Sequence, residues 1–493
     1  MNLTILHFND LHGRLEQLPR LYTLMRRERA KAEAEGRRVL LLDGGDSSDR
    51  ARWESDVTKG RANFSVLEAM GVQATVIGNG EALHWGRGAL GRLARSVGFP
   101  VLAANLVDTA AVNQPAAENQ PADERQLAAP GLRATAVIEL DGFRLGVVGV
   151  TQVYPGHYDR YGFRSVHPAG ALRRGVEALR AEGVRQILLL SHLGCPMPPE
   201  SKAEWPDPAV YTDDDVARDF PEIGIIVGGH SHTALETPIV IGGTVIAQAG
   251  DYGRWLGRLD VDLDDATGAV TAHRGWLIPC GAGVPLDPTI QGTLELVQEE
   301  AGRLLDAWIG SAREDVPQAV FANRVADALR EVCAADLAIF FSGFVYRGLK
   351  AGPITRRDLY QALPGATHIS AAEVSGAQIR RMVERMLRSP YRTQSFNPQR
   401  NAPPLRLPAH SANVRLRYDA EAGKLLECAI DGQPLDPARR YRLASTLFTL
   451  STVRNDPEYD YVGLEEGQVV ETIQVENVLW EVVEGWIKER GSI

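Results

Sequence analysis

Aspartate, asparagine and histidine recur in five short stretches of the N-terminal half of the chain: FNDLHG, LLDGGDSSD, IGNGE, LSHLG and VGGHSHT. Together they supply seven candidate metal ligands: Asp10, His12, Asp46, Asn79, His192, His230 and His232. Oxygen and imidazole donors suit hard or borderline divalent cations, and the imidazoles favour Mn, Zn, Co, Ni or Fe over Ca. Seven ligands exceed what one ion usually takes. The set therefore predicts two ions about 3.5–4 Å apart that share one carboxylate, as in two-metal phosphoester hydrolysis.

The five stretches differ in how specific they are. An isolated Asp-x-His pair is common, and a single histidine after a strand is more often structural than a ligand. The Gly-Gly-His-Ser-His stretch is more specific for a metal site, because two imidazoles flank one residue and the glycines permit a tight turn. The joint occurrence of all five, each after a predicted strand, favours a metal site over a structural explanation.

Apolar runs predict the elements that position these residues. Strands are expected over residues 3–8, 38–42, 74–77, 187–191 and 223–227, and helices over 15–35, 61–70, 85–97 and 170–182. Alternating strands and helices indicate a layered α/β architecture in which sites lie on loops at the carboxyl ends of strands.

The length of 493 residues is too great for one hydrophobic core and predicts two domains. We expect a catalytic domain over residues 1–286, a connecting helix within 287–311 and a second α/β domain over 312–493. Pro288 is a helix start signal, and the connecting helix is expected over 289–310. In the second domain, helices are expected over 323–335, 356–363, 375–387 and 475–490, and strands over 337–341 and 414–418.

Composition excludes some classes of protein. A formal net charge of -10 argues against a nucleic-acid-binding surface. No apolar run is long enough to cross a bilayer, so no membrane partner is expected. The four cysteines form no CxxC pair, and the first predicted strand begins almost at the first residue, without a signal peptide before it. A cytoplasmic protein with reduced thiols is expected. The sequence does not indicate an oligomeric state.

The order of motifs, D-x-H, G-D-x-x, G-N-x-E, a histidine after a strand and G-H-x-H, resembles that of the 5'-nucleotidase branch of the calcineurin-like metallophosphoesterases. Residues 246–264 and 321–365 are also similar to segments of that family. The resemblance implies a four-layer α/β/β/α sandwich, followed by a long helix and a C-terminal α/β substrate-binding domain.

The resemblance also implies a role for each ligand. Asp10, His12 and His232 would hold one metal, Asn79, His192 and His230 the second, and Asp46 would bridge them. A hydroxide between the ions would attack phosphorus in line. Manganese is the first expectation for the ions, with Zn, Co, Ni, Fe or Mg as alternatives. The substrate would be a nucleotide or another small phosphoester. Family members are often exported, in contrast to the cytoplasmic expectation.

One position departs from the family motif. Family members have histidine after the asparagine, where it stabilises transition-state charge or protonates the leaving oxygen; here the residue is Gly80. Positioned acid–base groups contribute about 10²–10⁴-fold, whereas electrostatic stabilisation usually contributes more. The loss should therefore slow or redirect catalysis. His84, four residues later, is a candidate catalytic replacement; alternatively, it caps or packs the helix that we expect to begin near residue 85.

The missing histidine leaves other functions open. Substrates that need less acid help, namely 2',3'-cyclic nucleotides and nucleotide diphosphate sugars, would suit a phosphodiesterase or diphosphatase. From a different class, the chain could be a catalytically weakened protein that binds metal and nucleotide.

The second domain of the family binds the nucleoside with arginines and a pair of aromatic rings. Here FFSGFVYRG replaces the usual N-G-G-x-R loop, which leaves Arg347 near the place of the arginine, and the usual G-G-D-G-Y is missing. Arg347 is a candidate phosphate contact. Candidate base-stacking rings are Phe344, Tyr346, Tyr459 and Tyr461, and core packing is the alternative for each ring.

Overall fold

The computed structural model describes residues 1–112, 126–195, 210–389, 407–450 and 460–493. The chain divides into two compact units, Met1–Ala301 and Gly302–Ile493. The boundary between the units falls inside helix α9 (Pro288–Leu305). Among the described residues, no helix combines the length and the apolar composition that a membrane crossing requires.

Unit 1 is built on two sheets. The first has the strand order β15 (Val270–Pro279), β14 (Trp255–Leu263), β1 (Asn2–Phe8), β2 (Arg38–Asp43), β3 (Ala74–Val76), β4 (Val101–Leu102) and β6 (Leu132–Arg133). The second has the order β12 (Ile239–Ile241), β13 (Thr244–Gln248), β11 (Ile223–Gly228), β10 (Gln186–His192), β8 (Phe143–Thr151) and β7 (Thr135–Leu140). Strands β1, β2, β3, β4 and β6 run parallel, as do β8, β10, β11 and β13.

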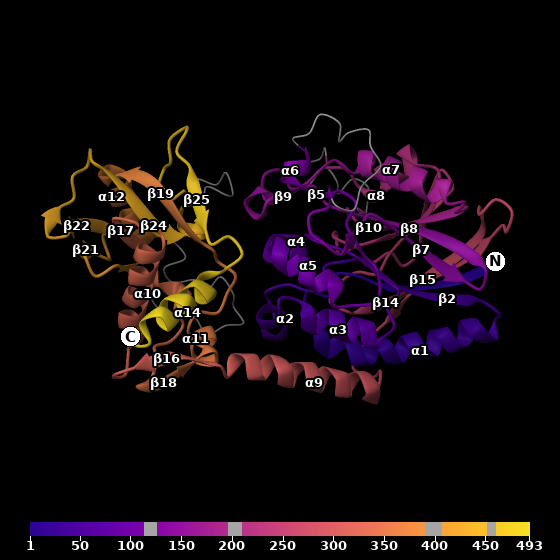
Figure 1. Ribbon diagram of the computed structural model, residues 1–493, viewed down its shortest axis with the longest axis horizontal. Helices are drawn as coiled ribbons and strands as arrows, with labels where there is room; N and C mark the ends of the chain where they lie inside the picture. The colour runs from indigo at the N-terminus through magenta and orange to yellow at the C-terminus, as the bar shows by residue number, and fades with distance from the viewer. Residues whose placement is uncertain (113–125, 196–209, 390–406, 451–459) are drawn as a thin grey trace. The chain divides into compact units, whose positions relative to one another are not determined.

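The two sheets pack face to face, and helices cover their outer faces. Ile5 and Leu40 of the first sheet share one buried apolar cluster with Val147 and Leu188 of the second. Helix α1 (Leu18–Ala34) contacts β1, β2 and β14. On the other side, α7 (Pro168–Ala181) and α8 (Asp213–Asp219) pack on the second sheet. Figure 1 shows α1 and α7 on opposite sides of the sheets. This arrangement confirms the four-layer α/β/β/α sandwich.

The remaining elements of unit 1 are short. They are α2 (Trp53–Thr58), α3 (Arg61–Ala69), α4 (Asn79–His84), α5 (Arg87–Arg95), α6 (Thr109–Val112), and the paired strands β5 (Leu106–Asp108) and β9 (Phe163–Ser165). The helix expected over 85–97 is α5, which begins at Arg87 and ends at Arg95; the separate helix α4 precedes it, before Trp85 and Gly86. Trp85 is fully buried in an extended conformation that breaks the helix, and Glu81 closes the first turn of α4 by accepting from Gly78 N–H.

The connecting helix is shorter than expected. It begins at Pro288, where the side chain of Asp287 accepts from the N–H groups of Thr289 and Ile290, and it ends at Leu305 rather than at residue 310. The chain then enters β16 (Trp308–Ala312), which pairs antiparallel with β18 (Gly352–Thr355). Pairing with this distant strand overrides the helical pattern of the sequence.

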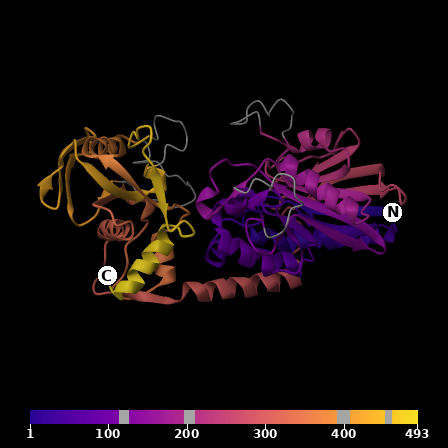
Figure 2. The ribbon, with the colours of Figure 1, turned by 45° about the horizontal axis from the view of Figure 1, so that its top comes forward.

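Unit 2 contains a five-stranded sheet in the order β20 (Pro408–His410), β17 (Leu337–Phe341), β24 (Arg440–Thr446), β19 (Ile369–Ser375) and β25 (Val470–Ile473). A smaller sheet joins β21 (Val414–Asp419), β22 (Lys424–Ile430) and β23 (Gln433–Pro434). The helices are α10 (Gln318–Val332), α11 (Arg356–Ala362), α12 (Gly376–Arg388), α13 (Leu447–Leu450) and α14 (Leu479–Arg490). The apolar face of α12 packs on β17, β19 and β24, and Figure 2 shows this helix against the sheet. Unit 2 is therefore an α/β domain, as expected.

Candidate metal centre

Five loops at the carboxyl ends of strands carry the seven predicted ligands. Asp10 and His12 follow β1, Asp46 follows β2, Asn79 follows β3, His192 ends β10, and His230 and His232 follow β11. Because β1 and β2 run parallel, and β10 and β11 also do, the loops of each sheet emerge at one edge. The face-to-face packing of the sheets brings the two sets together.

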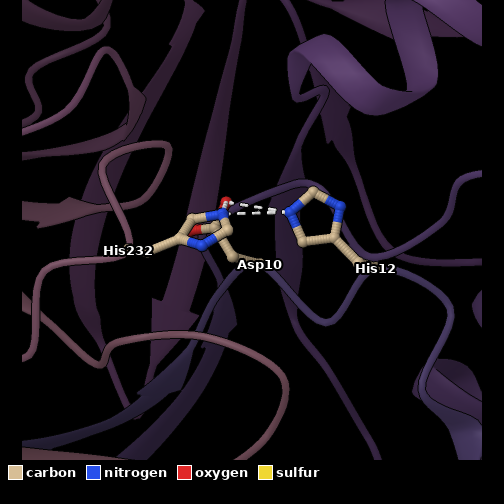
Figure 3. Close-up of side chains that lie close together, drawn as sticks. All are labelled: Asp10, His12 and His232. Atoms are coloured by element: carbon tan, nitrogen blue, oxygen red, sulfur yellow. Dashed lines mark hydrogen bonds and ion pairs between the residues drawn. The ribbon is translucent and has the colours of Figure 1, made fainter. Parts of the chain in front are cut away.

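Asp10, His12 and His232 form a first group. The Nε2 atoms of His12 and His232 lie 3.8 and 3.4 Å from Asp10 Oδ1, and 3.1 Å from each other. Figure 3 shows the two rings turned toward each other beside Asp10. These atoms satisfy the spacing of a common metal-binding group.

Asp10, Asp46 and His192 form a second group with the same property. His192 Nε2 lies 3.3 Å from Asp46 Oδ2 and 3.9 Å from Asp10 Oδ1. Asp46 Oδ2 is also 3.7 Å from His12 Nε2, so the Asp46 carboxylate faces a histidine of each group. The groups are therefore adjacent and share acidic residues.

Asn79 and His230 lie beside the second group. His230 Nδ1 is 2.7 Å from Asn79 Oδ1, and the rings of His230 and His192 have centroids 5.3 Å apart. The N–H of His230 donates to Asp10 Oδ2 at 2.9 Å. The structure thus brings all seven predicted residues into one cluster.

Three acceptors hold the far nitrogens of the histidines. Asp49 Oδ2 lies 2.9 Å from His12 Nδ1, and Asp251 Oδ2 lies 3.0 Å from His232 Nδ1. His192 Nδ1 donates to the carbonyl of Gly44 at 2.8 Å. Each contact leaves Nε2 directed at the acidic residues, which is the orientation that metal-bound histidines usually have. Sequence reasoning missed Asp49 and Asp251.

The electrostatics of the cluster favour positive charge. Burial lowers the pKa of His12, but the hydrogen bond to Asp49 and the charges of Asp46, Asp49 and Asp10 outweigh it and raise the pKa to about 9. Burial also opposes protonation of His192, yet the charge and hydrogen bond of Asp46 raise its pKa to about 10. His230 differs, since burial and the charge of His192 lower its pKa to about 4. A cation bound here would replace the protons of the first two histidines.

The donor set fits a divalent metal pair. Asp10 Oδ1 is buried and has no hydrogen-bond partner among the described residues, although three imidazoles face it. An acceptor left in this state costs free energy, roughly 1–3 kcal/mol, unless a cation or water satisfies it. Mixed carboxylate, amide and imidazole donors are those expected for borderline divalent ions.

Two family models match this chain, one in each unit. A sequence model of the calcineurin-like phosphoesterases matches residues 3–234, and one of the 5'-nucleotidase C-terminal domain matches residues 302–455. The chain belongs to the 5'-nucleotidase family of calcineurin-like metallophosphoesterases. It is therefore a metal-dependent phosphoester hydrolase of the 5'-nucleotidase type, and the resemblance inferred from the motifs is confirmed.

Curated relatives agree with this assignment at low identity. The uncharacterized metallophosphoesterase YunD of Bacillus subtilis is 25% identical over 77% of each chain. Protein UshA of Yersinia enterocolitica is 24% identical over 91% of this chain and 85% of that protein. The 5'-nucleotidase of Mus musculus is 28% identical over 59% of this chain and 51% of its own length.

Solved structures share the fold. The 5'-nucleotidase precursor from Thermus thermophilus is 21% identical, with a TM-score of 0.52, and covers 100% of this chain and 97% of its own. The Haemophilus influenzae NAD nucleotidase is 16% identical, with a TM-score of 0.57 and the same coverage. Both support the two-domain architecture.

Gly80, where the family motif has histidine, is the second residue of α4. Its N–H donates to Asp46 Oδ1 at 2.5 Å. A Cβ atom at this position would lie 2.9 Å from Asp46 Oδ1 and 3.3 Å from the carbonyl oxygen of Ser48. The Asp46 carboxylate therefore lies where a side chain of residue 80 would begin, and a side chain there would push against it.

His84 does not begin a helix, contrary to the capping expectation, because it is the last residue of α4. Its ring packs against Trp85 with centroids 6.2 Å apart. Burial and the charge of Arg50 lower its pKa to about 4, so the imidazole is neutral at neutral pH. The packing alternative agrees with this placement.

The predicted substrate residues of unit 2 have different surroundings. Tyr461 is 1% exposed, lies in the core and shares a hydrogen bond with Ser389, which contradicts base stacking by this ring. Phe344 is half-buried, and its ring centroid lies 5.9 Å from that of Phe448, a residue that sequence reasoning missed.

The other predicted substrate residues are less constrained. Tyr346 is half-buried, and its N–H donates to the carbonyl of Ala362. The side chain of Arg347 is 48% exposed and lies 3.6 Å from Asp358. Tyr459 lies outside the described residues.

Proposed function

We propose that this phosphoesterase hydrolyses nucleotides, with nucleoside 5'-monophosphates as the first substrate class. The observation that carries the proposal is the position of the Asp46 carboxylate, which faces His12 of one ligand group and His192 of the other. Asp10, His12 and His232 would hold one ion, Asn79, His192 and His230 the other, and Asp46 both. Two ions in this cluster would supply a nucleophilic hydroxide at neutral pH and neutralise phosphoryl charge.

The residues of the chain have distinct tasks in this proposal. Asp49, Asp251 and the carbonyl of Gly44 keep the imidazoles in place, which fixes the ligand geometry before substrate arrives. The N–H of Gly80 holds Asp46 by a hydrogen bond. These contacts preorganise the site, so reorganisation during the reaction is small.

We further propose that unit 2 binds the nucleoside. Phe344 and Phe448 offer a half-buried aromatic surface on which a base can stack. Arg347 has only a partly exposed ion pair with Asp358, which contributes little free energy, so a phosphate could replace the carboxylate. Tyr346 remains a proposed contact on the same loop.

Manganese is our proposal for the metal, because carboxylate and amide oxygens are combined with imidazoles. A cytoplasmic location is also proposed. It rests on the four cysteines, which are all buried free thiols in the structure. Metal analysis of the protein as purified and fractionation of the source cells test these two proposals.

The absence of a side chain at Gly80 favours a second substrate class. Cyclic 2',3'-nucleotides and nucleotide diphosphate sugars need less proton donation to the leaving group. If they are the true substrates, kcat/KM for them will exceed that for 5'-monophosphates.

The test is turnover of 5'-monophosphates, 2',3'-cyclic nucleotides and diphosphate sugars with Mn²⁺, alongside metal analysis. Asp46→Ala should lose metal and activity, whereas Glu177→Gln, which changes an exposed carboxylate on α7, should lose neither. If wild type turns over no substrate faster than Asp46→Ala, the proposal fails and a metal- and nucleotide-binding protein remains.

A further inference from the structure

The segment from Gln152 to Gly162, between β8 and β9, is fastened to the loops that carry the second group of ligands. Gln152 Nε2 donates to the carbonyl of Leu193, next to His192, at 2.7 Å. The Tyr161 hydroxyl donates to the carbonyl of Leu83 on α4 at 2.8 Å. The backbone N–H of Tyr154 donates to Ser165 Oγ at 2.9 Å. These bonds hold the segment in a defined position beside the metal centre.

Tyr154 is the residue of this segment that reaches the ligands. Its ring meets that of His230 edge to face, with centroids 6.2 Å apart and planes at 76°. His230 in turn contacts Asn79 at 2.7 Å, and Gly80 follows Asn79 in α4. Tyr154 therefore approaches the ligands proposed for the second ion, which include Asn79, the residue before Gly80.

Tyr158 packs against Tyr154. It is fully buried, and the two rings meet edge to face with centroids 6.1 Å apart and planes at 83°. Among the described residues, the Tyr158 hydroxyl has no hydrogen-bond partner. A buried hydroxyl without a partner is unfavourable, so this region favours a polar atom from water or a ligand.

Two other side chains near the centre fit the missing role less well. The His84 ring packs against Trp85 at the end of α4, with centroids 6.2 Å apart. The Tyr252 ring lies 5.6 Å from both His12 and His232, beside the first group rather than the second.

We propose that the Tyr154 hydroxyl donates a hydrogen bond to the departing ester oxygen and so replaces the motif histidine. This inference rests on the proposed nucleotide hydrolysis. As the bond between phosphorus and the ester oxygen breaks, the electron pair stays on that oxygen. The hydrogen bond stabilises the developing charge, the oxygen then takes a proton from water, and Tyr154 keeps its own. A tyrosine hydroxyl, whose ordinary pKa is about 10, keeps its proton at neutral pH and can donate.

The test compares two leaving groups in Tyr154→Phe, which keeps the ring and removes the hydroxyl. Loss of one such donor should lower kcat for a nucleoside 5'-monophosphate by about 10²-fold. The loss should be much smaller for p-nitrophenyl phosphate, whose leaving group is already acidic. Metal content and inhibition by inorganic phosphate should match wild type. Tyr211→Phe, which removes a hydroxyl bonded to Asp219 on α8, is the matched control and should change none of these values.

Two results would overturn the inference. The first is an equal change of kcat for both substrates in Tyr154→Phe, since a structural defect does not distinguish leaving groups. The second is a leaving-group-dependent loss in His84→Gln but not in Tyr154→Phe. The proposed function fails separately, through absence of nucleotide turnover in wild type.

Discussion

Restoring the histidine of the family motif at position 80 should impair this protein. In Gly80→His and Gly80→Ala, the added Cβ would stand 2.9 Å from Asp46 Oδ1 and 3.2 Å from its Cγ. The first separation is shorter than a normal contact and the second is tight, so the carboxylate must shift from its place between His12 and His192. The backbone N–H of Gly80 also donates to Asp46 Oδ1 at 2.5 Å. Because this N–H belongs to helix α4, it can follow the carboxylate only if the helix itself moves. The expected result is weaker metal binding.

The magnitude follows from the displaced ligand. Changes that misplace a metal ligand through its neighbours typically reduce affinity by about 10–100-fold. That range corresponds to roughly 1.4–2.7 kcal/mol of binding free energy. Gly78→Ala should be worse, because its Cβ would lie 2.0 Å from Asp46 Oδ1 and 2.5 Å from the Asp46 nitrogen. The expected order of manganese affinity is wild type, then Gly80→Ala, then Gly78→Ala.

Calorimetric titration of metal-free protein with Mn²⁺ at fixed pH measures this order. Gly283→Ala is the matched control, since nothing lies within 4 Å of its added Cβ. Melting in EDTA separates a folding defect from a binding defect. The reasoning is refuted if Gly80→His binds manganese as tightly as wild type and hydrolyses 5'-monophosphates faster. That result would mean that a histidine side chain fits at position 80 without moving Asp46 and restores the lost catalytic group.

Three further predictions concern separate features. Asp49→Ala removes the carboxylate that holds His12 and should weaken manganese binding about 10-fold or more by titration, without loss of fold. Burial lowers the pKa of His7 from 6.5 to about 4, so the unfolded chain takes up this proton at a higher pH than the folded chain does. The contribution of neutral His7 to the free energy of unfolding is therefore complete above pH 6.5 and is lost as the pH falls toward 4. That loss amounts to roughly 3 kcal/mol, and His7→Leu should flatten the dependence of urea unfolding on pH over this window. Phe344→Ala should raise KM for nucleotides by about 5- to 150-fold if the ring stacks on the base, whereas Tyr461→Phe should leave KM unchanged, and steady-state kinetics decides.

The ligand cluster could be predicted because its signals are local. Each ligand stands within a few residues of the end of an apolar run, and strands such as β1 and β10 have continuous buried faces. Parallel strands emerge at the same edge, so the position of Asp10 and Asp46 along the chain is enough to place them together. Strands with both faces buried need a second sheet or a helix on each side, so several of them predict a core of packed layers.

The partners of those ligands could not be predicted in the same way. Asp251 lies in the loop between β13 and β14 and contacts His232 Nδ1 at 3.0 Å, but it belongs to no motif that marked the other residues. Tyr461 looks like an exposed ring in a polar stretch, yet it fills the core of unit 2 beside Phe341 at 5.2 Å. Both outcomes depend on contacts between segments that are far apart in the sequence, which periodicity does not encode.

Backbone conformation is a further property that the motifs do not reveal, and it bears on why the cluster is functional. Five of the seven predicted ligands have positive φ angles, namely Asp10, His12, Asp46, His230 and His232, with values from 47° to 77°. Each such residue costs roughly 1–3 kcal/mol relative to an ordinary conformation. Backbone hydrogen bonds, such as Asp10 N–H to the carbonyl of Gly45 and His12 N–H to that of Asp46, hold these turns closed. Strain concentrated at the ligands is hard to explain by folding alone, because glycine or asparagine would adopt these turns more easily. Aspartate and histidine at these positions therefore indicate that the chain retains its metal chemistry despite Gly80.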